Sequence, residues 1–448
     1  MGRAIVFLSL LLMATSSGIG QHHRYADHVV LVSVDGLRPE FYLDQHWPAP
    51  MMQQMVREGA HAKAVRGVFP SVTYPSHTTM ITGALPKRHG VYYNRPFEPE
   101  GQTGRWYWEE SAIEVPTLWD AVKEAGLKTA SIAWPASVGA PIHWNIPEFW
   151  PLDPQGDPVE TVRSVTTPPE LFEEVQREAT GRLTPLHFGL GHLIRDDQAG
   201  VIAAYLLRRY RPALLTLHVV GTDRFQHQSG RQAPVVRQAV AAADRAISRI
   251  VEAAKHSGIL QRTAFIVTGD HGFSDIHTEL APNVWLVEAD LMEARSDRGN
   301  WRATFHTAGG AAFLHLRDAE DNQALSRVRT LLGAVQPLFR LVERPELDRI
   351  GADPSVPLAL AAHPGISFTS SPKGPVIRAT KGGAHGYFPE DFPQIYTGFI
   401  GWGAGFRARA VAPILRQEDI APLVAELLGL AFEAPDGISP RGFLKENH

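Results

Sequence analysis

Acidic and histidine side chains stand at the carboxyl ends of three apolar runs in this sequence. The run TAFIVTG is followed by Asp270 and His271, HVVLVSV by Asp35, and PALLTLHVVGT by Asp223, with His227 four residues later. A buried charge is costly to desolvate unless something pairs with it. The carboxyl ends of parallel strands meet at one edge of a sheet, so we expect these side chains to lie together. Three carboxylates and two imidazoles suit zinc or a similar divalent ion, although a carboxylate taken alone is also a common helix cap.

A further histidine belongs to the same prediction. His385 lies between glycines in KGGAHGYFP, where the backbone can bring it close to a site, and a surface loop position is its alternative. Six protein ligands are too many for one tetrahedral zinc. They suit two ions roughly 4 Å apart, as in two-metal phosphoryl-transfer enzymes. One ion would then activate a nucleophile, and the other would stabilise charge on the leaving oxygen.

The nucleophile is expected in residues 69–94, FPSVTYPSHTTMITGALPKRHGVYYN. Five candidate hydroxyls of this stretch lie before or within a short helix predicted to begin near Ser76: Ser71, Thr73, Ser76, Thr78 and Thr79. The first turn of a helix presents free N–H groups and the positive end of the helix dipole to an incoming phosphate. The residues alone leave the choice among the five hydroxyls open.

The elements that must position these residues alternate between strand and helix patterns. Buried strands are predicted at 28–36, 128–134, 212–221, 263–272 and 310–316, and amphipathic helices at 116–126 and 237–258. The alternation indicates an α/β fold with a mostly parallel central sheet flanked by helices. The Pro- and Trp-rich stretch 133–159 is interpreted as an insertion above the active-site edge. Residues 21–448 are expected to form one catalytic domain.

Composition narrows the function classes. The chain is 44% hydrophobic with a net charge of −4, which does not indicate a nucleic-acid-coating surface. Residues 1–20 have the layout of a secretory signal peptide, and their apolar run is too short for a stable membrane anchor. We therefore expect export to a periplasm or the medium. With no cysteine, the chain has no disulfides, and metal ligands are restricted to nitrogen and oxygen.

Six separated motifs carry a resemblance to a known family: VSVDGLRPE, PSVTYPSHTTMITGALPKRHGVYYN, KTASIAWPAS, TDRFQHQSG, VTGDHGFSD and GGAHGYFP. In this order they resemble the nucleotide pyrophosphatase/phosphodiesterase family of the alkaline phosphatase superfamily, from about residue 28 to 390. The resemblance implies an alkaline-phosphatase-like fold. It also implies hydrolysis of a small-molecule phosphate ester.

The resemblance also assigns roles to individual residues. It implies that Thr73 is the nucleophile, that one zinc is held by Asp35, Thr73, Asp270 and His271, and that a second is held by Asp223, His227 and His385. Asn94 matches an asparagine that donates to a non-bridging phosphate oxygen. Tyr74 matches an aromatic that stacks a nucleotide base, with Trp144, Phe149 and Trp150 as candidates for the opposite wall. The implied reaction is a two-step displacement through a phosphorylated threonine.

The resemblance favours a diesterase over a phosphomonoesterase. Related monoesterases carry a lysine and an arginine in a segment that here reads AWPAS, with Pro135 and Ser137 at those places. Lys87, Arg88 and Arg95 remain as cations that could reach the site by another route. A zinc-dependent phosphomonoesterase and a phosphonoacetate hydrolase are therefore kept as alternatives.

Other classes fit the sequence less well. A sulfatase normally needs a cysteine, and a cofactor-independent phosphoglycerate mutase uses serine and manganese in the cytosol. A binding protein on a decayed hydrolase scaffold should have lost a ligand or the nucleophile, whereas every expected position is filled.

Overall fold

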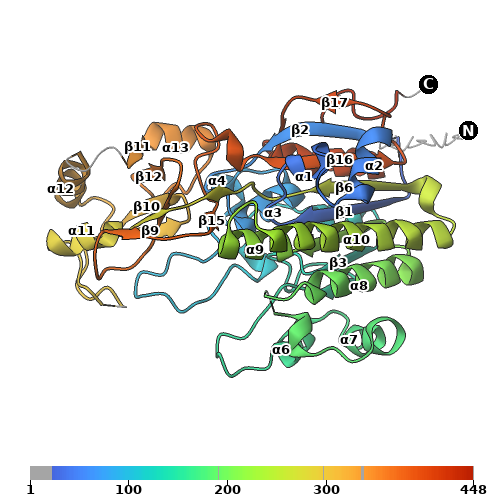
Figure 1. Cartoon of the computed structure of the whole chain (residues 1–448), viewed down its shortest axis with the longest axis horizontal. Helices are drawn as coiled ribbons and strands as arrows, with labels where there is room; N and C mark the ends of the chain where they lie inside the picture. The colour runs from blue at the N-terminus through green and yellow to red at the C-terminus, as the bar shows by residue number, and fades with distance from the viewer. Residues whose placement is uncertain (1–22, 190, 296, 334–337, 447–448) are drawn as a thin grey trace, which may run out of the picture.

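A nine-stranded sheet is the centre of the computed structural model, which describes residues 23–189, 191–295, 297–333 and 338–446 (Figure 1). The predicted signal peptide, 1–20, lies outside the described residues. The strand order is β17 (Val411–Ala412), β2 (Ala60–Arg66), β16 (Thr397–Gly403), β6 (Thr263–Thr268), β1 (His28–Val34), β5 (Leu214–Val219), β3 (Thr129–Ile132) and β4 (Trp144–Ile146), with β18 (Leu415–Arg416) also paired to β2. The strands from β6 to β4 are all mutually parallel, and β16 is antiparallel to its neighbours. The predicted mostly parallel sheet is confirmed.

Helices cover both faces of this sheet because its central strands are apolar on both sides. In β1, Val30 and Val32 face a core shared with α2 (Pro50–Glu58), α8 (Ile194–Tyr210) and α10 (Pro234–His256). Val29 and Leu31 face a second core shared with α3 (Thr73–Thr82), α5 (Leu118–Glu124) and α14 (Ile420–Leu428). In the described part of the chain, no helix combines the length and apolar character needed to span a membrane.

A second, antiparallel sheet lies beside the first, at the left of Figure 1. Its order is β11 (Phe339–Glu343), β12 (Leu358–Ala362), β10 (Ala311–Leu316) and β9 (Ala303–Ala308), and it packs with α11 (Pro282–Glu288), α12 (Asn322–Gly333) and α13 (Arg344–Ile350). The strand predicted at 310–316 is therefore correct as a strand, but its expected place among the parallel strands is wrong. A tight turn at Gly309, with a φ of +64°, pairs it with β9 instead.

Shorter elements complete the chain. The helices are α1 (Glu40–Leu43), α4 (Pro86–His89), α6 (Pro158–Val165), α7 (Leu171–Val175) and α9 (Gly221–Ser229). A three-stranded sheet joins β13 (Ile366–Phe368), β8 (Thr278–Leu280) and β14 (Ile377–Ala379), and β15 (Gly383–Ala384) pairs with β7 (Ser274–Asp275).

Two local predictions need correction. Helix α3 begins at Thr73 rather than near Ser76, because Pro75 lies in its first turn, where a missing N–H costs no hydrogen bond. The stretch 133–159 is not only an insertion above the sheet, since β4 lies within it and forms the edge strand beside β3. The helices expected at 116–126 and 237–258 are confirmed as α5 and α10.

Buried neutral histidines make the stability of this fold depend on pH. Burial lowers the pKa of His89 to about 3. Its Nδ1 accepts the N–H of Val91 at 3.1 Å, and its Nε2 lies 3.1 Å from Thr79 Oγ1. An unfolded histidine has a pKa near 6.5. Between about pH 6.5 and 3 the unfolded chain therefore binds a proton at His89 that the folded chain does not bind, and the free energy of unfolding decreases as the pH is lowered.

We therefore expect His89→Gln to weaken this dependence. Between pH 6.5 and 5 the free energy of unfolding of the variant should fall less steeply than that of the wild type, by about 1 kcal/mol per pH unit. Urea unfolding at a series of pH values measures both slopes. Equal slopes would show that the pKa of His89 is not lowered in the folded protein.

Candidate active site

The carboxyl ends of β1, β5 and β6 deliver the predicted ligands to one edge of the central sheet. Asp35 directly follows β1, Asp270 and His271 lie just beyond β6, and Asp223 and His227 lie on α9, directly after β5. The spacing of four residues places Asp223 and His227 on one face of α9. His385 comes from the loop after β15.

Asp35, Asp270 and His271 form the first ligand group. His271 Nε2 lies 3.4 Å from Asp35 Oδ1 and 3.2 Å from Asp270 Oδ2. These three atoms are buried and have no hydrogen-bond partner among the described residues. Unpaired buried acceptors that converge on one point are unfavourable unless a cation lies between them.

Asp223, His227 and His385 form the second group. Asp223 Oδ1 lies 3.3 Å from His227 Nε2 and 3.6 Å from His385 Nε2, and the two imidazole nitrogens are 3.1 Å apart. The rings of His385 and His271 stack with centroids 3.6 Å apart, so the two groups adjoin. The sequence-predicted ligand residues are thus brought together, in two adjoining sets.

Backbone carbonyls orient all three histidines of these groups. The Nδ1–H of His271 donates to Gly272 O at 3.1 Å, that of His385 to Ser71 O at 3.0 Å, and that of His227 to Gly383 O at 2.9 Å. A carbonyl oxygen can only accept, so the hydrogen lies on Nδ1. Each Nε2 therefore points its lone pair into the site, as a metal-ligating histidine requires.

The pKa values reflect charges held close together out of water. Burial raises the pKa of Asp35 well above its ordinary value, and the carboxylates of Asp270 and Asp223 raise it further. Burial lowers the pKa of His271 to about 4 and that of His385 well below its ordinary value. The neutral imidazoles of His271 and His385 beside mutually repelling carboxylates form the arrangement that a divalent cation stabilises. At His227 the lowering effect of burial is outweighed by the carboxylate of Asp223, which raises the pKa of that imidazole.

Thr73 is the one of the five candidate hydroxyl residues that lines the cavity at this edge, beside Asp35, Asp223 and His227. Ser71, Thr78 and Thr79 have their side-chain oxygens hydrogen-bonded away from it, to Tyr387, Tyr74 and His89 respectively. Thr73 is the first residue of α3 and is 7% exposed.

Asn94 faces the same cavity in a fixed orientation. Its Oδ1 accepts the backbone N–H of Tyr74 at 2.9 Å, so its Nδ2 remains the side-chain donor. Tyr74 lines the cavity but is buried beneath Trp106, with ring centroids 5.3 Å apart.

Trp144 is not placed as expected. It stacks on Tyr210 with centroids 4.1 Å apart and does not line the cavity, because β4 holds it in the central sheet. Trp150, which was another candidate for this wall, does line the cavity, together with Trp106, which the sequence did not indicate; their rings are 4.9 Å apart. Trp106 lies in a loop that returns beside Asn94, where Tyr107 N–H donates to Asn94 O at 3.2 Å.

Two histidines that the sequence prediction missed lie behind the ligands. His218, within β5, has its Nε2 3.1 Å from Asp35 Oδ2 and its Nδ1 3.1 Å from Ala133 O. His77, on α3, donates from Nδ1 to Thr73 O at 2.8 Å, and its ring meets that of His218 at 4.3 Å. The sequence feature that could have indicated His218 is its place inside the apolar run LLTLHVV, because a histidine buried in a strand needs a polar partner.

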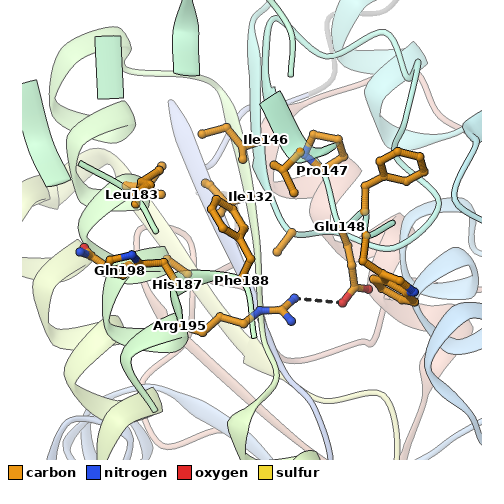
Figure 2. Close-up of a pocket in the computed structure, with 15 residues that line it drawn as sticks. Ile132, Ile146, Pro147, Glu148, Leu183, His187, Phe188, Arg195 and Gln198 are labelled. Carbon is orange, nitrogen blue, oxygen red and sulfur yellow. Dashed lines mark hydrogen bonds and ion pairs between the residues drawn. The ribbon is translucent and has the colours of Figure 1, made fainter. Parts of the chain in front are cut away.

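A buried ion pair closes the side of the site next to β4. Figure 2 shows Arg195 reaching toward Glu148, and the two groups approach to 3.1 Å. The other carboxylate oxygen of Glu148 accepts from Tyr74 Oη at 3.4 Å. Apolar side chains of β3, β4 and α8 surround the pair in this pocket, among them Ile132, Ile146 and Ile202.

Asp196 was also missed, and it fixes the helix that carries the second ligand group. It is buried, and its two carboxylate oxygens accept the N–H groups of Val220 and Gly221 at 3.0 and 2.9 Å, at the start of α9. A carboxylate is favoured at this position because the N–H groups of the first turn lack partners within the helix.

Comparisons with known proteins place the chain in a family. Residues 29–388 match the family model described as type I phosphodiesterase / nucleotide pyrophosphatase, and the chain belongs to this family. Ectonucleotide pyrophosphatase/phosphodiesterase family member 3 of Rattus norvegicus is 26% identical over 255 residues, which cover 54% of this chain and 24% of that protein. The chain thus matches about a quarter of that relative's length. Family member 7 of Homo sapiens is 23% identical over 469 residues, covering 97% of this chain and 88% of that protein.

Solved structures support the fold assignment. Human ectonucleotide pyrophosphatase/phosphodiesterase 5 superposes with a TM-score of 0.64 at 18% identity, covering 92% of this chain and 97% of that one. The murine counterpart, solved as an inactive threonine-to-alanine variant in complex with AMP, gives a TM-score of 0.65 at 18% identity, covering 91% and 96%. The alkaline-phosphatase-like fold expected from the sequence is confirmed.

The contacts of Asp196 predict an effect on metal affinity. In Asp196→Asn, one backbone N–H of α9 would face an amide donor instead of a carboxylate oxygen, and Asp223 and His227 would lose their fixed position. We expect the zinc affinity to fall about 10- to 100-fold, measured by competition with a chromophoric chelator.

Asp244→Asn is the matched control. Asp244 is another buried carboxylate that accepts two N–H groups at the start of a helix, those of Met51 and Met52 of α2. The Asp244→Asn variant should have a lower melting temperature than the wild type and an unchanged zinc affinity. If both variants bind zinc like the wild type, Asp196 does not position the site.

Proposed function

We propose that this protein is an exported phosphodiesterase that hydrolyses phosphate diesters through a phosphorylated Thr73 with the help of two zinc ions. The observation that carries the proposal is the convergence of unpaired buried acceptors from Asp35, Asp270 and His271 beside a cavity that Asp35 and Thr73 both line. The family supports the reaction class. The inactive threonine-to-alanine variant of the murine relative, with its bound AMP, supports a threonine nucleophile and a nucleotide substrate.

The donor set fits zinc, since it consists of carboxylate oxygens and imidazole Nε2 atoms with Nδ1 already used. Asp35, Thr73, Asp270 and His271 would hold one ion, and Asp223, His227 and His385 the other. When bound, zinc would lower the pKa of the attacking hydroxyl and neutralise charge on the leaving oxygen.

The residues of the chain would then carry out two displacements. Thr73 Oγ, having lost its proton to water, attacks phosphorus in line. The bond from phosphorus to the leaving oxygen breaks, and the electron pair stays on that oxygen. Water then attacks the same phosphorus, the Thr73 Oγ–P bond breaks, and the hydroxyl is restored as a phosphate monoester leaves. The Nδ2 of Asn94 would donate to a non-bridging oxygen throughout.

The surroundings of the phosphoryl group favour a diester. At the places where related monoesterases carry cations, Pro135 supplies none, and Ser137 donates its Oγ–H to Trp134 O at 2.6 Å. A diester has one fewer charge to neutralise and needs room for a second substituent. Trp106 and Trp150 provide an apolar wall for such a substituent.

The N-terminal sequence supports the export part of the proposal. Its basic start, apolar run and small polar residues are typical of a secretory signal peptide. A periplasmic or secreted location follows.

Substitution of Thr73 tests the reaction. With zinc present, we expect the wild type to hydrolyse bis-p-nitrophenyl phosphate at least about tenfold faster than p-nitrophenyl phosphate. Thr73→Ala should lower the diester rate by a factor of about 1,000 or more, because the covalent route is lost. Initial rates at saturating zinc measure both.

Ser76→Ala is the matched control on the same helix. Its Oγ is buried without a partner among the described residues, so its removal should leave the rate within about threefold. A wild type that prefers the monoester would make the protein a phosphomonoesterase. An active Thr73→Ala protein would exclude the threonine intermediate.

A further inference from the structure

Glu148 lines the cavity of the candidate active site but belongs to neither ligand group. We call this cavity, which Thr73 also lines, the nucleophile cavity. The other carboxylates among its described lining residues are Asp35 and Asp223, whose charges would be neutralised by bound zinc. Glu148 is 6% exposed and is not one of the ligands. Its negative charge is therefore the one on these lining residues that the metal ions would not offset.

The partner of Glu148 lies on the side away from the nucleophile cavity. Glu148 Oε1 is 3.1 Å from Arg195 Nη2. Arg195 lines the apolar pocket of Figure 2 and is not among the described residues that line the nucleophile cavity. Glu148 and Trp150 line both cavities and so form their border. The ion pair thus presents its negative end to the nucleophile cavity, where the field keeps the sign of the nearer charge.

The other carboxylate oxygen of Glu148 lies close to the reacting groups. Glu148 Oε2 accepts from Tyr74 Oη at 3.4 Å and is 3.9 Å from His218 Nδ1. Tyr74 directly follows Thr73 in the chain, and His218 Nε2 lies 3.1 Å from Asp35 Oδ2. Only one side chain therefore separates Glu148 from a metal ligand, and its tyrosine partner is the neighbour of the nucleophile.

The cations near the site do not cancel this charge. Those that the sequence left open are held by other groups: Lys87 by Asp348 O at 2.9 Å, Arg88 by Asp436 at 3.0 Å, and Arg95 over the ring of Trp106. None of the three is among the described residues that line the nucleophile cavity. Arg224 does line it, but its side chain is exposed, so that solvent and salt screen its charge. The buried charge of Glu148 is screened less.

The charge at phosphorus decides how Glu148 affects a substrate. A diester carries one negative charge there, and its second substituent would lie against the wall that Trp150 and Glu148 form. A monoester has a further charged oxygen in place of that substituent. Two like charges at short distance in a partly desolvated site repel each other strongly. Glu148 would therefore accept a diester and disfavour a monoester.

We propose that Glu148 determines substrate specificity by repelling a phosphoryl group that carries a second negative charge. This inference rests on the proposed phosphodiesterase function and goes beyond it, because it assigns the rejection of monoesters to one residue and to repulsion. The same repulsion acts on the product, since hydrolysis of a diester leaves a monoester at this place. Glu148 thus limits product inhibition as well as monoester turnover.

Inhibition by a phosphate monoester measures the repulsion. The probe is phenyl phosphate, which carries two charges at about pH 8, with bis-p-nitrophenyl phosphate as the substrate and zinc at saturation. In Glu148→Gln we expect the inhibition constant of phenyl phosphate to fall about tenfold or more. The rate on p-nitrophenyl phosphate should rise by a similar factor relative to the rate on the diester. The diester is the internal reference, so general damage to the site cancels in this ratio.

Arg195→Met should have the opposite effect. It leaves Glu148 in place without its counter-charge, so the inhibition constant should rise and the ratio of monoester to diester rates should fall. Glu174→Gln is the matched control. Glu174 also accepts tyrosine hydroxyls, those of Tyr205 and Tyr210 at 2.6 Å, and it is not among the described lining residues of the nucleophile cavity. This control should change neither the inhibition constant nor the ratio.

A purely structural role for Glu148 predicts a different result. Glu148→Gln and Arg195→Met would then slow both esters by one factor and weaken phenyl phosphate alike, and the proposal would be overturned. If the wild type hydrolyses neither ester, the proposed function fails, and calorimetry on zinc-loaded protein decides the role of Glu148. Tighter binding of phenyl phosphate to Glu148→Gln than to the wild type would support the repulsion, and equal or weaker binding would overturn it.

Discussion

The rest of the structure depends on one electrostatic constraint at the carboxyl edge of a parallel sheet. Asp35 and Asp270 are buried there beside the half-buried Asp223, and the three carboxylates have too few partners. Asp35, Asp223 and Asp270 each present a carboxylate oxygen with no hydrogen-bond partner in the described part of the chain. Such a cluster is destabilising unless positive charge is supplied. Because the histidines beside them are held by their Nδ1 atoms, that charge is best supplied by cations bound at Nε2.

Hydrogen bonds between the loops restrain this edge of the sheet. The N–H of Gly36 donates to Asp270 Oδ1 at 2.9 Å, which ties the loop after β1 to that after β6. Gln226 Nε2 donates to Gly36 O at 3.0 Å, and Thr222 Oγ1 donates to Asp35 O, so α9 is tied to the same loop. A metal site assembled from three strands keeps its geometry only if such contacts restrain it.

The sequence predicted the parts of the site that follow from local order along the chain. A ligand directly after an apolar run must lie at the end of a strand, which is why Asp35, Asp270 and His271 were placed correctly. The helical spacing of Asp223 and His227 is equally local. The residues that contact and support these ligands come from segments distant in the sequence. His218 on β5 contacts Asp35 at the end of the neighbouring strand β1, and Val220, the residue before α9, donates to Asp196, which lies 24 positions upstream.

The incorrect predictions have the same origin, since they also concern contacts between segments distant in the sequence. The assignment of Trp144 to the cavity assumed that residues 133–159 lie above the sheet, but β4 pairs with β3 and turns Trp144 toward Tyr210. The strand at 310–316 has the composition of a parallel core strand, yet a tight turn commits it to a hairpin. Composition specifies that a strand is buried, whereas the choice of neighbouring strand depends on turn geometry and on contacts far along the chain.

The central claim is that two zinc ions fill this edge, and anomalous diffraction at the zinc absorption edge from crystals grown with zinc tests it most directly. Two anomalous peaks about 4 Å apart are predicted, one among Asp35, Asp270 and His271 and one among Asp223, His227 and His385. A single peak, or one placed instead by His77 and His218, would contradict the account.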